Sequence, residues 1–447
     1  MSVGIPIAAH LHVEPKRVVV CGAGLAGLVA AHELARARMD VTILDARDRL
    51  GGRVWTVRDG FAEGQHGELG GEFIDAEHKY MHALVERFRL SLVPVLRGGF
   101  THRYSPAAGV IKIARADAWY TLRDLLAPLI RRYQKAEGDS DADDVRDLAT
   151  YSVRRWLDER AVDREPYAIA KAVRGFFLAD PDELSVLQVV EQLADGDVPS
   201  QVRMFRIAGG ADRLVRALAQ ATMAHVRLGH RVGRIARMPD RMVVHATSDR
   251  GELTEFEAHA VVIALPASTL RDIDIVPPLP EDQRRAIAAV RYGRATKVVV
   301  QTLSRALRDR RAQAFATDTA LGAFWDATGG QPSERHSLIH FLAGGSASAQ
   351  LRQRTREGAR ALLSDLCWLG LAGAPVTTLR SMTWEDDAYA CGGYAFTDPA
   401  FDPSWRPLLK RRAGHVVFAG EHTSDDFQGY MEGAVRSGMR AAAEVME

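Results

Sequence analysis

Hydrophobic and polar positions first follow a strand pattern. Short apolar runs with polar flanks, Arg17 to Cys21 and Val41 to Ala46, predict two buried strands. An alanine-rich stretch between them, Leu25 to Ala37, predicts a helix. A strand, a glycine-rich turn, a helix and a second strand within about 30 residues form a βαβ unit. The pattern therefore predicts a parallel sheet near the N-terminus.

A helical pattern replaces it further along, and we expect a helical region near residues 118–196. The acidic stretch 139–144 predicts a solvated connection, and Val145, Leu148, Trp156 and Leu157 predict one further helix. The first helix of this region places one apolar face at helical spacing, formed by Trp119, Leu122, Leu125, Leu126, Leu129, Ile130 and Tyr133.

Strand-like runs then return. The length of 447 residues predicts two or three domains. The later strands are expected at Met242 to Thr247, Ala260 to Leu265, Lys297 to Gln301, Ser337 to Leu342 and Val416 to Ala419.

Composition narrows the class of protein. A net charge of +1 gives no field that would gather nucleic acid or an anionic membrane. Cys21, Cys367 and Cys391 match no zinc spacing and give no disulfide framework, so a reducing cytoplasm is the expected compartment and no metal is expected. The first 16 residues lack a secretory pattern, and no run of about 18 apolar residues predicts a membrane span.

The first chemical motif is the glycine-rich turn from Gly22 to Gly27, G-A-G-L-A-G. Its first glycine permits a tight turn, the second lets the backbone approach a pyrophosphate, and the third lets helix and strand pack closely. The helix that follows turns its N-terminus toward the phosphates. Asp45 ends the second strand, where a carboxylate can accept hydrogen bonds from ribose hydroxyls. The unit predicts a bound dinucleotide.

Further segments carry a family resemblance. L-D-A-R-D-R-L-G-G-R at Leu44 to Arg53 resembles the signature of the flavin amine oxidases, which include monoamine, polyamine and L-amino acid oxidases. Asp45 stands where that family usually has glutamate, and Arg38 stands where a glycine is common. The resemblance covers residues 17–80, 206–300 and 380–440. Other matching segments are Glu68 to Ile74, Tyr292 to Val298, Phe418 to Thr423 and Gly429 to Val435.

The resemblance implies an α/β fold, with a Rossmann-type FAD-binding domain built on a parallel sheet. A discontinuous substrate domain of mixed sheet and helices accompanies it. The FAD-binding domain is expected at residues 1–80, 206–290 and 380–447, and the substrate domain at 81–205 and 291–379. Some monoamine oxidases link FAD to a cysteine just before the first of two tyrosines that form the walls of an aromatic cage. Gly393 occupies that place here and Cys391 lies two residues earlier, so noncovalent FAD is expected.

The resemblance also implies the cofactor site. The positions that match FAD contacts are Gly22, Gly24, Leu25, Ala26, Gly27, Asp45, Ala46, Arg47, Gly52, Arg53, Gly70, Gly71, Glu72, Phe73, Val232, Trp384, Tyr389, Gly420, Glu421, Gly429, Tyr430, Met431 and Ala434.

Three residues match the catalytic positions of the family. Tyr394 and Tyr430 match the walls of an aromatic cage, and Lys297 matches a lysine that holds a water near the flavin. Glu72 and Asp326 are candidates for binding a distal ammonium of a diamine. No side chain is assigned as a strong base.

The implied activity is oxidation of an amine to an imine by hydride transfer to FAD. Hydrolysis then gives an aldehyde and ammonia or an amine, and O2 becomes H2O2. An L-amino acid oxidase is the second candidate, in which an arginine such as Arg103 would bind the carboxylate. A flavin-dependent C–C desaturase and a non-catalytic FAD-binding scaffold lie outside this class. The expected partners are a small amine and O2, and the sequence leaves a homodimer open.

Overall fold

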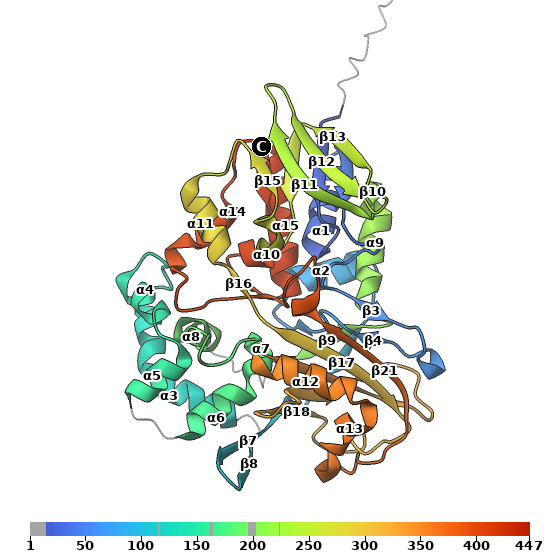
Figure 1. Cartoon of the computed structure of the whole chain (residues 1–447), viewed down its shortest axis with the longest axis vertical. Helices are drawn as coiled ribbons and strands as arrows, with labels where there is room; N and C mark the ends of the chain where they lie inside the picture. The colour runs from blue at the N-terminus through green and yellow to red at the C-terminus, as the bar shows by residue number, and fades with distance from the viewer. Residues whose placement is uncertain (1–14, 115–116, 161–163, 195–202, 223) are drawn as a thin grey trace, which may run out of the picture.

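The computed structural model describes residues 15–114, 117–160, 164–194, 203–222 and 224–447. The expectation about a secretory leader, and the last two residues of the predicted helical region, concern positions outside this part of the chain. Figure 1 shows a parallel sheet with its helices in the upper half and a larger mixed sheet in the lower half. A helical region lies beside the mixed sheet.

A five-stranded, all-parallel sheet forms the upper half. All of its strands therefore end at the same edge, which brings Gly22, Asp45, Ala264 and Gly420 together at or just beyond the strand ends. This confirms the predicted βαβ unit and its parallel sheet. In spatial order the strands are β10 (His225–Arg227), β2 (Asp40–Leu44), β1 (Arg17–Cys21), β14 (Ala260–Ile263) and β23 (Val416–Phe418).

Helices α1 (Leu25–Arg36), α9 (Asp212–Thr222) and α15 (Met431–Met446) pack together on this sheet around a shared apolar core. Helices α1 and α15 approach closely, because a Cβ added to Gly438 would lie 2.4 Å from the Ala26 carbonyl oxygen. In the turn before β2, Arg38 adopts a left-handed φ of 62°, a conformation that glycine adopts more easily. The family's preference for glycine there thus has a backbone cause.

A second, four-stranded sheet extends from the nucleotide half. It consists of β13 (Leu253–Ala258), β12 (Met242–Ser248), β11 (His230–Arg237) and β15 (Asp274–Val276). Three smaller sheets complete the connections. They are β5 (Ile74–Asp75), β9 (Met204–Ile207) and β6 (Leu92–Val95); β3 (Thr56–Val57) with β4 (Gly67–Glu68); and β16 (Arg291–Tyr292) with β22 (Ala395–Phe396).

A seven-stranded mixed sheet forms the lower half, and its strand β17, which lies between β21 and β20, is buried along its whole length. Helices α12 (Ser346–Arg356) and α13 (Ala359–Ser364) pack on it. Strand β21 crosses the predicted domain boundary at residue 380, and the division into domains stays a prediction. The strand order is β21 (Val376–Thr383), β17 (Ala295–Thr302), β20 (Ser337–Gly344), β19 (Ala323–Asp326), β18 (Ala314–Thr317), β7 (Thr101–Ala107) and β8 (Val110–Ala114).

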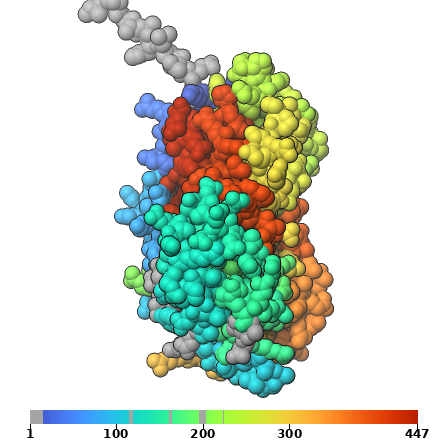
Figure 2. Space-filling view, turned by 90° about the vertical axis from the view of Figure 1, so that its left-hand side faces the viewer, coloured from blue at the N-terminus to red at the C-terminus, as the bar shows by residue number. Residues whose placement is uncertain are grey.

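The helical region has an apolar core of its own. Figure 2 shows it in teal, below the red C-terminal segment. Two helices stand where one was expected after the acidic connection, because Ser152 caps a new helix by accepting a hydrogen bond from the Arg155 amide at 3.1 Å. The helices are α3 (Asp117–Lys135), α4 (Asp143–Ala149), α5 (Val153–Glu159), α6 (Arg164–Ala172), α7 (Arg174–Phe177) and α8 (Val186–Ala194).

The remaining helices are short connections around these layers. Within the described residues, no helix is long and apolar enough to cross a membrane. The helices are α2 (Lys79–Arg87), α10 (Ala267–Leu270), α11 (Glu281–Ala289) and α14 (Arg406–Lys410).

Candidate active site

A cavity of about 710 Å³ begins at the carboxyl ends of the parallel strands and continues between the mixed sheet and the helical region. Ligands of open α/β sheets bind at this edge of the sheet. Every residue that the sequence assigned to the site lines this cavity, except Gly27, Asp326 and the alternative carboxylate ligand Arg103. Gly27 instead serves helix packing, since a Cβ there would lie 1.9 Å from the Gly22 carbonyl oxygen.

The glycine turn leaves room on its cavity side. Gly22 has a φ of +108°, and a Cβ on it would lie 2.8 Å from the Ala264 carbonyl oxygen. A Cβ on Gly24 would meet no protein atom within 4 Å, so open space lies in front of it. The first-turn amides of α1, which have no partner inside a helix, begin directly after Gly24. The turn therefore forms a cradle for an anionic group.

Asp45 lies at the end of β2 and accepts hydrogen bonds from the Ala23 amide at 2.7 Å and the Arg47 amide at 2.8 Å. Each carboxylate oxygen accepts one of these bonds and keeps a further lone pair. Burial raises the pKa of this carboxyl above its ordinary value. Arg47 in turn forms a two-pronged ion pair with Asp387, with both N–O distances at 2.7 Å. This pair fixes the segment that carries Tyr389 beside the nucleotide end of the cavity.

Arg53 connects the first nucleotide segment with the C-terminal motif. Its guanidinium donates to the Gly393 carbonyl at 2.6 Å and to Glu421 at 2.9 Å. The other Glu421 oxygen accepts the Gly429 amide at 2.8 Å. The three segments that enclose the middle of the cavity are therefore held by one partly buried ion pair and its hydrogen bonds.

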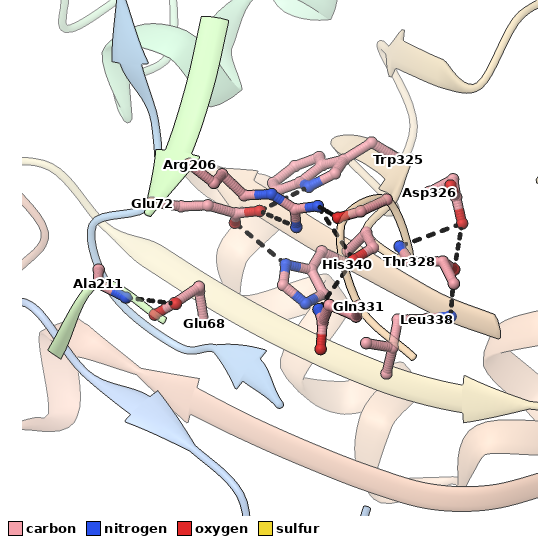
Figure 3. Close-up of polar contacts among 12 residues, drawn as sticks. Glu68, Glu72, Arg206, Ala211, Trp325, Asp326, Thr328, Gln331, Leu338 and His340 are labelled. Carbon is pink, nitrogen blue, oxygen red and sulfur yellow. Dashed lines mark hydrogen bonds and ion pairs between the residues drawn. The ribbon is translucent and has the colours of Figure 1, made fainter. Parts of the chain in front are cut away.

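Glu72 is the centre of a buried polar cluster, drawn in Figure 3. One carboxylate oxygen contacts Lys297 Nζ at 2.7 Å and His340 Nδ1 at 3.0 Å. The other accepts from Arg206 at 3.1 Å and from the Trp325 indole at 3.2 Å. Burial opposes ionisation, but Lys297, followed by His340 and Arg206, holds the pKa of Glu72 well below its usual range. Glu72 therefore stays ionised, with all of its acceptor positions used within the protein.

Lys297 lies on β17 with its ammonium at the cavity wall. It donates to Glu72 and, at 2.9 Å, to the Gly70 carbonyl. An ammonium has three donors, so one remains for a water or another acceptor in the cavity.

Asp326 does not reach the cavity. Its carboxylate accepts a hydrogen bond from the Thr328 hydroxyl at 2.5 Å and another from the Thr328 amide at 3.3 Å (Figure 3). The Asp326 side chain therefore stabilises the turn that follows β19, and it does not point into the space where a substrate would bind.

Tyr394 and Tyr430 both line the middle of the cavity. The Tyr394 hydroxyl donates to the Phe176 carbonyl of α7 at 2.6 Å. The Tyr430 ring lies against His78, with ring centres 5.2 Å apart. Burial raises the pKa of both phenols above the ordinary value, so both keep their protons at neutral pH.

Beyond the tyrosines the cavity becomes mainly apolar and aromatic. Apart from Phe73, which matches an FAD contact, the sequence did not assign this part, because its residues come from α3, α7 and several strands with no common motif. The only sequence signal for these residues was the amphipathic pattern of the helices. That pattern shows which side chains are buried, but it does not show which of them face a cavity. Its larger side chains are Phe73, Phe100, Trp119, Phe176, Phe177 and Leu342.

A family model of flavin containing amine oxidoreductases matches residues 25–446. The chain belongs to this family. "Putative flavin-containing monoamine oxidase AofH" of Mycobacterium tuberculosis is 29% identical over 453 residues, covering 96% of each chain. The mouse L-amino-acid oxidase is 27% identical, covering 97% of this chain and 71% of that one. The solved cyclohexylamine oxidase of Brevibacterium oxydans has a TM-score of 0.84 at 24% identity, covering 97% of this chain and 99% of the other.

As a flavin containing amine oxidoreductase, the chain uses FAD, and its residues fit that group. The open cradle at Gly24 suits the pyrophosphate, and the remaining lone pairs of Asp45 suit a ribose. Helix α15 begins at the cavity with Met431, so its positive end suits the electron-rich side of a reduced flavin.

Proposed function

We propose that this flavin containing amine oxidoreductase oxidises an amine that carries no carboxylate. The amine loses a hydride and a proton to become an imine, which water hydrolyses to an aldehyde and ammonia or a smaller amine. Bound FAD supplies the acceptor for the two electrons, which O2 then removes as H2O2.

The observation that carries this proposal is the charge of the cavity lining. Within the described residues, its arginines are Arg47 and Arg231 on the nucleotide side and Arg53 at the middle of the cavity. Arg47 and Arg53 are already paired with Asp387 and Glu421. A substrate carboxylate placed beyond the tyrosines would therefore lose its hydration without gaining a cationic partner, which is costly.

The alternative L-amino acid oxidase needs such a partner. Arg103, the candidate for that role, does not line the cavity, and its guanidinium lies 4.8 Å from the ring centre of Trp368. Among the cavity-lining residues that the structure describes, Lys297 is the remaining cation near the tyrosines, and Glu72 already neutralises it.

The chain's own residues bind, orient and hold water. Tyr394 and Tyr430 act as neutral aromatic walls that orient the amine, and the apolar pocket beyond them excludes water from its carbon chain. Lys297, fixed by Glu72 and the Gly70 carbonyl, directs its third donor toward a water in the cavity.

We also propose that FAD is held without a covalent bond. Gly393 stands at the position that matches the family's linkage and offers no thiol, and a Cβ there would lie 2.3 Å from Leu178 Cδ1, so a side chain would have to displace Leu178. Acid precipitation should leave the flavin in the supernatant. Flavin that stayed with the polypeptide would contradict the proposal.

The test of function is an anaerobic flavin-bleaching screen with substrate pairs that differ only in a carboxylate. The pairs are cadaverine with L-lysine, putrescine with L-ornithine, and phenethylamine with L-phenylalanine. We expect the amine of at least one pair to bleach the flavin at least about 100-fold faster, with H2O2 on readmission of air; a factor of 100 corresponds to about 2.7 kcal/mol. Faster bleaching by the amino acids would support the alternative. Bleaching by none of the probes would contradict the amine substrate class.

A further inference from the structure

Asp75 is a carboxylate in the substrate half of the cavity that the sequence did not assign. It ends β5, three residues after Glu72, and lines the cavity together with Tyr430. Its side chain is 18% exposed. No described residue donates a hydrogen bond to its carboxylate. The only signal in the sequence was its place inside the segment G-G-E-F-I-D, in which Glu72 is the residue that matches an FAD contact.

His78 lies next to Asp75 but donates no hydrogen bond to its carboxylate. The Asp75 amide donates to His78 Nδ1 at 3.0 Å, so the neutral ring carries its proton on Nε2. That nitrogen is 3.6 Å from the Asp75 carboxylate, too far for a hydrogen bond, and has no other partner. Burial, followed by the charges of His82 and Arg436, lowers the pKa of His78 to about 4, so the ring is uncharged at neutral pH.

The other carboxylates of the cavity are engaged or lie elsewhere. Glu72 is bound by Lys297 and Arg206, and Glu421 is bound by Arg53. Asp45 and Asp272 lie on the nucleotide side, at the end of β2 and just after α10. Among the described residues, Asp75 is therefore the carboxylate near the tyrosines that lacks a cation.

A partly buried carboxylate without a counter-charge is costly, and a cationic group of a ligand lowers that cost. We propose that Asp75 binds the second cationic group of a diamine or polyamine whose reacting nitrogen lies between Tyr394 and Tyr430. This inference rests on the proposed amine oxidation and adds the substrate class. The apolar walls between the two polar ends would contact the carbon chain that separates the two nitrogens.

The test compares substrates that differ only in the second ammonium, putrescine with n-butylamine and cadaverine with n-pentylamine. Anaerobic rapid mixing gives the limiting rate of flavin bleaching and the apparent Kd separately. For the wild-type protein we expect the ratio of rate to Kd to favour the diamine at least about tenfold, which corresponds to about 1.4 kcal/mol. In Asp75→Asn this preference should fall to about one, mainly through a weaker Kd for the diamine.

Two acidic positions provide matched controls. Asp326→Asn removes a carboxylate of the same type that does not line the cavity. Glu77→Gln removes an exposed carboxylate whose charge acts on Asp75. Both variants should retain the preference for the diamine.

The preference should also depend on pH. Burial, followed by the charge of Glu77, raises the pKa of Asp75 to about 7. Asp75 attracts an ammonium only when ionised, so the preference should rise as the pH increases through about 7 and should be flat in Asp75→Asn. The distal ammonium, with a pKa of about 10, stays charged throughout. Three elements bring other titratable or charged groups close to Asp75. Glu77 and His78 follow it in the chain, and His82 lies on α2. Tyr430 and Arg436 come from the start and first turns of α15, and Arg203 and Arg206 come from β9 and the residue before it.

The outcomes separate the two proposals. If amines bleach the flavin but the wild-type protein shows no preference for the diamine, the role of Asp75 is wrong and the amine oxidase remains. The same holds if Asp75→Asn weakens both members of each pair equally. If no amine bleaches the flavin, the proposed function fails first. The wild-type ratio and its pH profile test the inference even if the variant does not fold.

Discussion

At the scale of single residues, Glu72 shows how one carboxylate organises the centre of the site. It joins Lys297 on β17, His340 on β20 and Arg206 on β9. Such a cluster stabilises the fold only while every member is satisfied, because each buried charge is otherwise left without a partner. A change to any member of this cluster is therefore expected to affect both the stability of the fold and the position of Lys297.

Replacing Glu72 by glutamine tests this cluster. Glu72→Gln keeps the shape but leaves Lys297 and Arg206 without their anion, so we expect a loss of about 3 kcal/mol in the free energy of unfolding. We also expect slower reoxidation of the reduced flavin by O2, because Lys297 loses the contact that holds it. Denaturant unfolding and oxygen-mixing kinetics measure the two effects.

Glu68→Gln is the matched control. Burial raises the pKa of Glu68 to about 7, and its oxygens are bound by the Thr56 hydroxyl and the Ala211 amide rather than by a cation. This change should cost only about 1 kcal/mol. An equal loss in both variants would show that the ion pairs of Glu72 contribute little.

The sequence located the residues of this site better than it located their partners. Glycines and charged residues in contiguous motifs could be placed because each motif is one local turn. Arg206 and His340 lie 134 and 268 positions from Glu72, and nothing in the sequence pairs them. Lys297 and Glu72 were assigned separately, and their ion pair appears only in the folded chain.

At the scale of elements, the turn before α1 contains glycines that have two different roles. A methyl group on Gly24 would enter the cavity, whereas one on Gly27 would overlap the Gly22 carbonyl. The same motif thus contains one position that serves the ligand and one that serves helix packing.

Gly24→Ala and Gly27→Ala should therefore behave differently. Because Gly24 has a φ of −71°, which alanine adopts readily, we expect the stability of the flavin-free protein to change by less than about 1 kcal/mol. Its FAD affinity should fall at least about tenfold, or about 1.4 kcal/mol. Gly27→Ala should destabilise the flavin-free protein by about 3 kcal/mol. Unfolding curves and FAD titrations distinguish them, and equal effects on stability would contradict the assignment.

Helix α15 also contacts the N-terminus of the neighbouring helix α2 through a side chain. The fully buried Glu432 accepts the Tyr80 amide at 3.1 Å and the Met81 amide at 2.8 Å, so it caps α2 from outside. We expect Glu432→Ala to cost about 2 kcal/mol or more in unfolding free energy, because it leaves two amides without acceptors. Glu444→Ala on the same helix removes only a partly exposed pair with Arg440 and should cost about 0.5 kcal/mol. Similar losses would argue against the cap.

At the scale of the whole molecule, the fold class could be predicted because a βαβ unit and a family signature fix the parallel sheet and the mixed sheet. The apolar substrate pocket could not, because its residues come from the helical region and from strands far apart in the chain. Burial patterns describe which residues are inside a protein, but they do not distinguish a packed core from a cavity wall.

The cofactor site joins both halves, since its lining includes the parallel-sheet turns and Lys297 of the mixed sheet. Removing FAD should therefore lower the unfolding temperature of the whole chain. Added FAD at 100 times its Kd should restore about 2.7 kcal/mol, and the midpoint should keep rising with concentration. Riboflavin, which lacks the nucleotide half, should stabilise less in the same thermal scans. A midpoint that is independent of FAD would contradict this coupling.

The hydrogen bond from Tyr394 to the Phe176 carbonyl has a consequence for engineering this protein. The Tyr394 wall of the cavity is anchored to the backbone of α7, so grafting the helical region from a homologue would also change the position of this wall. Chimeras intended to change only the preferred chain length of the substrate should therefore keep α7 from the recipient. Those that replace it will need a new partner for the tyrosine hydroxyl.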